Sequence, residues 1–184
     1  MLTLESLKAD DEVVASLSDL CDFELQDDAP ERPFCSVEGV SDLTVFARDG
    51  SGGQFVMSPS GQVFYFSSEG GGGLLAEDLT ALVRLLVYRP YWQDLLKYSA
   101  RGNLDEMRRA DVALAEDWWL EETSLSARDA LKDHLDLEPE GDVVAKLHKA
   151  ASTALIIRNA WESPAEPLFG RFTIDDNPML RTTG

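Results

Sequence analysis

The stretch between residues 46 and 98 most strongly constrains what this chain can fold into. Two short runs rich in β-branched and aromatic residues, Leu43–Arg48 and Gln54–Met57, are joined by Asp49-Gly50-Ser51-Gly52-Gly53. Glycine readily takes the positive φ that tight hairpin loops require, and the flanking runs have the composition of strands. The pattern therefore predicts a β-hairpin.

Downstream of this hairpin the sequence predicts a third strand and then helices. The turn sequence Ser58-Pro59-Ser60-Gly61 precedes Gln62–Phe66, which continues an antiparallel meander. Gly70 to Gly73 are interpreted as a loop, because no Gly-Lys-Ser/Thr follows them and nearby carboxylates would repel a phosphate. Leucines at helical spacing then predict an amphipathic helix over 74–88, with a second helix over 91–98 after Pro90.

The length and composition fit one soluble globular domain. A chain of 184 residues buries roughly 70% of its unfolded surface, and its hydrophobic and charged fractions are ordinary. The expected fold class is α+β, with an antiparallel β-meander packed against several helices in a single domain over 1–184. The sheet core is expected at about 43–67, a helical half at about 75–162 and an irregular tail at 163–184.

The cysteines and the N-terminal sequence indicate a cytoplasmic protein. Cys21 and Cys35 are too few for a disulfide framework, so we expect reduced, buried thiols, whether or not the two lie close together. The first twelve residues lack the apolar core of a secretory signal. No run approaches the ~20 apolar residues of a membrane span.

Negative charge is concentrated in two blocks. Residues 1–42 hold twelve acidic and two basic residues, residues 104–142 hold thirteen and four, and the whole chain carries a net charge of −18. Direct binding to nucleic acid or to an anionic membrane depends on lysine and arginine, so this charge argues against both. A basic protein partner is favoured instead, although an acidic surface that only maintains solubility is the alternative.

Helical patterns account for most of both blocks. Apolar residues over 4–20 form a helical stripe that is interrupted at 9–12, and a loop is predicted over 24–33. The second block predicts a helix over 104–122 and then a short helix with Ser126 as a possible N-cap.

The last part of the chain predicts a helix and then an irregular tail. The helix begins after Asp142 within 143–161, but the apolar run 154–157 fits a strand equally well. The irregular tail is expected to pack back through Leu168, Phe169 and Phe172.

The end of the 104–122 helix supplies a candidate interface. Trp118 and Trp119 are neighbours, and a helix rarely buries two adjacent side chains equally. An exposed tryptophan among carboxylates is typical of a protein interface, whereas packing of both rings into the core is the alternative. The candidate partner-binding residues are Glu116, Asp117, Trp118, Trp119, Glu121 and Glu122.

No group of residues predicts catalysis or metal binding. Ser51 lies in a glycine-rich loop, but the Gly-x-Ser-x-Gly elbow is absent, and no motif brings His134 or His148 near it. The two histidines lie fourteen residues apart, and no His-Glu-x-x-His or Cys-x-x-Cys occurs. We therefore expect no catalytic residue, no cofactor and no metal site, in a protein that is not an enzyme.

About a third of the chain resembles the SUKH superfamily. The matching segments are Phe46-Ala47-Arg48-Asp49-Gly50-Ser51-Gly52-Gly53, the strand through Phe55 and Val56, the strand Val63–Phe66 and the helix Leu79–Leu86. The segments Tyr91-Trp92-Gln93-Asp94-Leu95-Leu96 and Asn103-Leu104-Asp105-Glu106-Met107 are similar to bacterial members. In that family the pattern is a glycine-containing hairpin, a further strand and an apolar helix that crosses the sheet.

The resemblance implies a binding function. SUKH proteins include immunity proteins encoded beside bacterial polymorphic toxins, which implies that this protein binds and neutralises a cognate toxin, often a nuclease with a basic cleft. Other members are regulators, so a regulatory or scaffold protein with an endogenous partner is the alternative. The family has no catalytic residues, and its partner-binding positions vary with the toxin, so the resemblance assigns no site.

Overall fold

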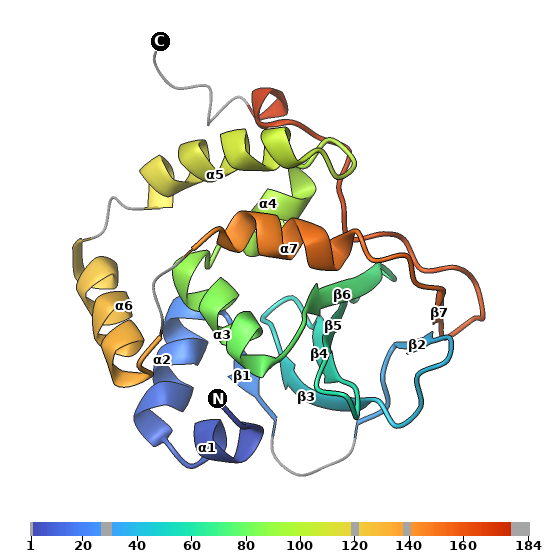
Figure 1. Ribbon diagram of the computed structural model, residues 1–184, viewed down its shortest axis with the longest axis horizontal. Coiled ribbons are helices and arrows are strands. Elements are labelled where there is room, and N and C mark those ends of the chain that lie inside the picture. The colour runs from blue at the N-terminus through green and yellow to red at the C-terminus, as the bar shows by residue number, and fades with distance from the viewer. Residues whose placement is uncertain (1, 27–30, 119–121, 138–140, 178–184) are drawn as a thin grey trace.

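The computed structural model describes residues 2–26, 31–118, 122–137 and 141–177. Within these residues a five-stranded antiparallel sheet, with strand order β1-β3-β4-β5-β6, packs against helices (Figure 1). The α+β class and the packing of the meander on helices, both expected from the sequence, are confirmed.

Two helices precede strands β1 to β6 in the chain, and the other helices and strand β7 follow them. The strands are β1 (Glu24–Leu25), β2 (Cys35–Val37), β3 (Thr44–Arg48), β4 (Gln54–Met57), β5 (Val63–Phe66), β6 (Gly72–Ala76) and β7 (Ile157–Asn159). The helices are α1 (Leu4–Lys8), α2 (Asp11–Cys21), α3 (Leu79–Tyr88), α4 (Trp92–Lys97), α5 (Leu104–Trp118), α6 (Glu122–His134) and α7 (Val143–Ala151), with the short 3₁₀ helix η1 (Ile174–Asp176) near the C-terminus.

The predicted hairpin and third strand are confirmed. Arg48 pairs with Gln54 across the glycine-rich loop, and Met57 pairs with Val63 across the following turn. A register shift near Ala47 interrupts the first ladder and turns two successive side chains of β3 toward the same core. The meander is therefore the central part of the sheet, as its turn residues predict.

Both faces of the sheet are buried. Val63 and Tyr65 face a large core that is shared with the helices, whereas Phe64 and Phe66 face a second, smaller core. Side chains alternate between the faces of a strand, so β5 must be apolar at every position once both faces are covered. The second core is completed by the two-stranded sheet of β2 and β7.

The prediction for the four-glycine segment is wrong in part. Gly72 and Gly73 open strand β6, which pairs with β5, so 74–76 are strand and the helix begins only at Leu79. A Cβ on Gly73 would lie 2.8 Å from the Leu168 side chain, and one on Gly72 would lie 2.9 Å from Phe66. These glycines are therefore needed where side chains pack directly against the backbone of a strand.

Most of the apolar run 154–157, which fitted helix and strand equally well, is neither helix nor strand. Helix α7 ends at Ala151, and only the last residue of the apolar run, Ile157, belongs to strand β7, which pairs with β2. In the tail, Leu168 and Phe169 pack against the large core as expected. Phe172 does not, because 39% of it remains exposed.

The acidic blocks form helices with two departures from expectation. The first stripe divides into α1 and α2 at the predicted break, but β1 occupies the start of the predicted loop over 24–33. Helix α6 begins at Glu122, so Ser126 lies inside the helix and the N-cap prediction is wrong. The predicted helix over 104–122 is α5 up to Trp118.

The two cysteines lie on different sides of the sheet. Cys21 belongs to the large core and Cys35 to the smaller one, and both are buried free thiols. Burial raises the pKa of Cys21 to about 12 and also raises the pKa of Cys35, because the thiolate is poorly solvated there.

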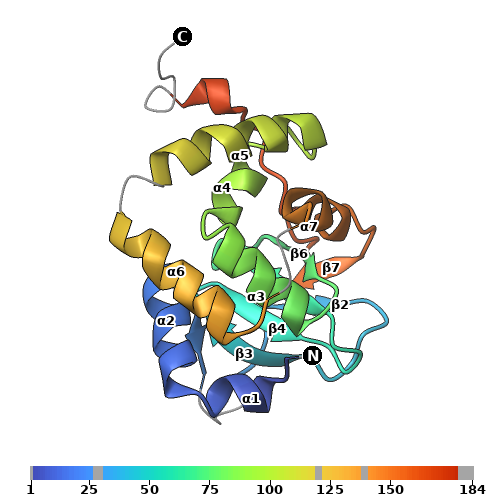
Figure 2. The same ribbon diagram turned by 60° about the vertical axis from the view of Figure 1, so that its left-hand side comes forward.

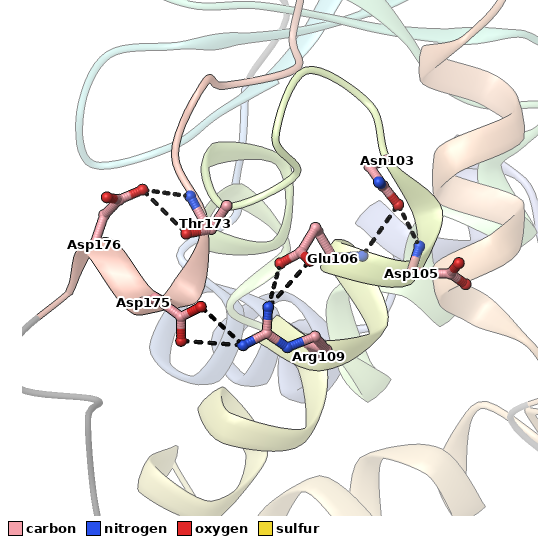
Figure 3. A network of polar contacts seen from close by, with 7 residues as sticks. All are labelled: Asn103, Asp105, Glu106, Arg109, Thr173, Asp175 and Asp176. Carbon is pink, nitrogen blue, oxygen red and sulfur yellow. Dashed lines mark hydrogen bonds and ion pairs between the residues drawn. The ribbon is translucent and has the colours of Figure 1, made fainter.

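The C-terminal segment is fastened to α5 by a polar network (Figure 3). Arg109 donates to both carboxylate oxygens of Glu106, one turn away, and to both oxygens of Asp175 on η1, at 2.8 to 3.0 Å. Asn103 caps α5 by accepting from the backbone amides of Asp105 and Glu106. These carboxylates of α5 and η1 are therefore engaged within the molecule.

Candidate protein-binding surface

The two acidic blocks, far apart in the sequence, meet in the fold. Helices α2 and α6 pack against each other and lie side by side in both views (Figures 1 and 2). His134, in the last turn of α6, places its Nε2 2.7 Å from Oδ2 of Asp10, the residue that caps α2. We call α2 and α6 the acidic helix pair.

Apolar side chains explain why these helices pack as they do. Val13, Leu17 and Cys21 recur at helical spacing on α2 and are buried, and Leu131 is buried on α6. Most of the described polar residues of these helices, although not Arg128, are thereby turned toward solvent. Among the side chains of the pair that the structure describes, the exposed carboxylates are those of Asp11, Glu12, Asp19, Asp129 and Asp133.

Few cations offset this charge. Helix α2 carries no basic residue at all. On α6, Arg128 is 1% exposed, Lys132 donates to Asp129 at 2.8 Å, and His134 faces Asp10. Among the described residues, no ion pair engages four of the five exposed carboxylates, namely Asp11, Glu12, Asp19 and Asp133.

Only part of the sequence-predicted site can be placed. Glu116 is exposed on α5, shortly before α6 begins. The side chains of Asp117, Trp118 and Glu122 lie outside the described residues, as do Trp119 and Glu121 entirely. The choice between a core and an interface position for the two tryptophans therefore stays a prediction.

The contribution of α2 was missed by the residue-level prediction, which considered the second block alone. The sequence did indicate that the first block could contribute to a binding surface, because both blocks carry a similar net negative charge. Nothing local in either block indicates that they touch. That contact depends on the tertiary fold, in which α6 packs against α2 and α3 (Figure 2).

The glycine-rich hairpin loop holds a buried carboxylate. Asp49 is 4% exposed, and its Oδ1 accepts from the backbone amides of Ser51 and Gly53 and from the Ser51 hydroxyl. Its Oδ2 accepts from the Tyr65 hydroxyl at 2.6 Å and from Nε2 of Gln93 at 2.7 Å. The Ser51 hydroxyl is thus one of five donors to this carboxylate, of which Tyr65 on β5 and Gln93 on α4 join the loop to the rest of the fold.

Hydrogen bonding outweighs burial at this carboxylate. Burial alone would raise the pKa of Asp49, but the hydrogen bonds from Tyr65, Ser51, Gly53 and Gln93 hold it below its ordinary value. Burial raises the pKa of the Tyr65 hydroxyl, and the neighbouring carboxylate raises it further. Asp49 therefore stays ionised, as an acceptor of fixed geometry in the loop.

The two histidines are engaged apart from this loop. His134 faces Asp10 in the acidic helix pair. His148 places its Nε2 2.8 Å from the carbonyl oxygen of Gly102, and its ring packs against Phe169 with centroids 5.4 Å apart. Both positions link elements that are distant in the sequence.

The chain matches no family model, no curated protein and no solved structure at a significant level. No helix among the described residues is both long and apolar enough to cross a bilayer. In the same parts of the chain, no group of three or more His, Cys, Asp or Glu side chains is arranged to hold a metal ion. Its function is therefore inferred from its own residues.

The contact between Asp10 and His134 predicts a measurable acid sensitivity. The hydrogen bond from the Val13 backbone amide, and then that with His134, lowers the pKa of Asp10 below its ordinary value of 3.8. A lowered native pKa contributes stability that is present above the unfolded value and is lost as pH falls through the native one. We expect Asp10→Asn, which keeps a capping oxygen but cannot ionise, to flatten the loss of stability below about pH 4.

Urea denaturation between pH 2.5 and 7 measures this effect. Asp133→Asn is the matched control, because Asp133 is exposed on the same helix pair without an ion pair to any described residue. If the free energy of unfolding fell equally steeply with decreasing pH in the wild type and in Asp10→Asn, the lowered pKa of Asp10 would not be the cause of the acid sensitivity.

Proposed function

We propose that this chain is a SUKH-like immunity protein that binds a basic toxin domain and neutralises it, and that the acidic helix pair is the surface it uses. One observation carries the proposal: α2 and α6, from opposite halves of the chain, pack together, and four of their five described exposed carboxylates form no ion pair with a described residue. The resemblance of residues 46–98 to the SUKH superfamily supplies the class of partner.

Electrostatics provides the mechanism. A nuclease toxin carries lysine and arginine in the cleft that holds phosphates, so a surface of unpaired carboxylates is attracted to the same cleft. Complementary charge of this kind raises association rates toward 10⁸ to 10⁹ M⁻¹s⁻¹ at low ionic strength. Occupation of the cleft excludes the nucleic acid, and no chemistry is required of the immunity protein.

The remainder of the molecule suits a scaffold. Residues 43–103 carry five acidic and five basic residues and contribute the central strands and the helices α3 and α4. Their apolar side chains fill both cores. The charged blocks are thus displayed on a rigid, electrically neutral frame, which limits the entropy lost on binding.

A charge-reversal experiment tests the proposal. The partner is the toxin domain encoded beside this gene in its native genome, purified and mixed with this protein in a stopped-flow instrument at several salt concentrations. We expect the triple variant Glu12→Lys, Asp19→Lys and Asp133→Lys to associate at least roughly tenfold more slowly at low salt, with the difference shrinking as salt is added.

A second triple variant separates local from global charge. Glu38→Lys, Glu69→Lys and Glu166→Lys make the same change in net charge at exposed positions outside the helix pair, and association should slow by only about threefold. Equal effects of the two triple variants would argue against the helix pair as the contact surface. Undiminished toxin activity at equimolar wild-type protein would contradict neutralisation itself.

A further inference from the structure

A partly enclosed groove lies away from the acidic helix pair, between α3, α7 and the end of β6. Its volume is about 290 Å³, which suits a small ligand rather than a macromolecule. Apolar side chains make up a large part of its lining. They belong to Leu75, Ala76, Ala81, Leu85, Val143 and Leu147.

The polar part of the lining is cationic, which is unexpected in a chain with a net charge of −18. Arg84 comes from α3, and Lys146 and Lys149 come from α7. Two carboxylates also line the groove, but both are engaged: Glu77 accepts from Lys149 Nζ at 2.6 Å, and Asp78 caps α3 by accepting from the amide of Ala81 at 2.7 Å. Three cations against two anions leave the groove with a net charge of +1.

Two groups in the groove have hydrogen-bonding capacity that no described residue uses. The Nε of Arg84 is buried, and no described residue accepts a hydrogen bond from it. A buried donor of this kind is rare in proteins unless another molecule completes its hydrogen bonding. The Thr80 hydroxyl oxygen accepts from the backbone amide of Leu2 at 3.2 Å, so its own hydrogen can be donated to a ligand.

We propose that this groove binds a small organic monoanion, a carboxylate carried on an aliphatic body. The guanidinium of Arg84 and the ammonium of Lys146 would receive the carboxylate, and the leucine and valine side chains would cover the aliphatic part. A ligand with a single negative charge balances the net charge of the groove, whereas a phosphate dianion would leave one negative charge uncompensated. The site shares no residue with the acidic helix pair and stands independently of the toxin-binding proposal.

Isothermal titration calorimetry with sodium octanoate tests the proposal, with 1-octanol and sodium acetate as the neutral and the short-chain probe. We expect one octanoate to bind per chain, with affinity at least tenfold above that for either control probe. Both the charge and the aliphatic body contribute, so the loss of either weakens binding. An affinity for octanol or for acetate equal to that for octanoate would overturn the proposal.

Three variants locate the site. Arg84→Gln and Lys146→Gln should each weaken octanoate binding at least fivefold. Lys146 is exposed, so its replacement does not put folding at risk. Arg171→Gln removes one positive charge from the C-terminal segment, outside the groove lining, and should leave the affinity unchanged. Octanoate binding that survives both groove variants, or that falls equally in Arg171→Gln, would contradict the assignment.

Discussion

Replacing Asp49 with alanine is expected to lower the free energy of unfolding by about 4 kcal/mol, which corresponds to a fall of roughly 10 °C in Tm. The variant removes the acceptor of five hydrogen bonds at once. The Tyr65 hydroxyl and the Gly53 amide are buried, so water cannot replace the lost acceptor there. Each orphaned buried donor costs about 1 to 3 kcal/mol.

Urea denaturation of Asp49→Ala, Asp49→Asn and Asp133→Ala, each compared with the wild type, measures this effect. Asp49→Asn preserves shape and one acceptor oxygen, so its loss should be about half that of Asp49→Ala. Asp133→Ala removes an exposed carboxylate from α6 and should change stability by less than about 0.5 kcal/mol. A loss below about 1 kcal/mol in Asp49→Ala would mean that the loop is not held by this carboxylate.

Gly170→Ala is expected to cost about 3 kcal/mol, because the added methyl group meets backbone rather than a movable side chain. A Cβ there would overlap the Lys97 carbonyl oxygen and would lie only 2.7 Å from the Lys97 Cα, at the end of α4. Gly170 also donates to the Leu96 carbonyl at 2.9 Å and accepts from the Arg101 amide at 2.7 Å. The methyl group therefore separates the C-terminal segment from the turn between α4 and α5.

Hydrogen exchange identifies this separation directly. Faster exchange is expected at the Ala100 and Arg101 amides, which donate to Phe172 and Gly170. Gly71→Ala is the matched control, since its Cβ would lie 3.1 Å from the Ser67 hydroxyl, a group that can rotate aside. If Gly170→Ala matched Gly71→Ala in both stability and exchange, the close approach would not be a constraint on the fold.

Local patterns predicted the meander well because its determinants are local. The loop from Asp49 to Gly53 forces a reversal between two β-rich runs, whichever helices later cover the sheet. Strand β6 was missed because its glycines depend on distant residues: Leu168, nearly a hundred residues later, fills the space that a side chain at Gly73 would occupy. Ser126 is a good N-cap residue, but α6 extends through it from Glu122.

The candidate surface was predicted only at the level of composition. Counting charges located both acidic segments, and a helical stripe at Val13 and Leu17 indicated which face of the first helix is buried. The contact that brings Asp10 to His134 spans 124 positions and has no local signature. Tertiary packing, not propensity, brings the two segments into contact.

Because β2 pairs with β7, the smaller core can close only late in the synthesis of the chain. The two strands are separated by about 120 residues, and Ile157 completes the apolar cover over Phe64 and Phe66. On the ribosome, the central strands emerge long before their second cover does. Until residue 157 has left the exit tunnel, an aromatic face of the sheet is open to water, so a stalled or truncated chain presents a surface for chaperones or for aggregation.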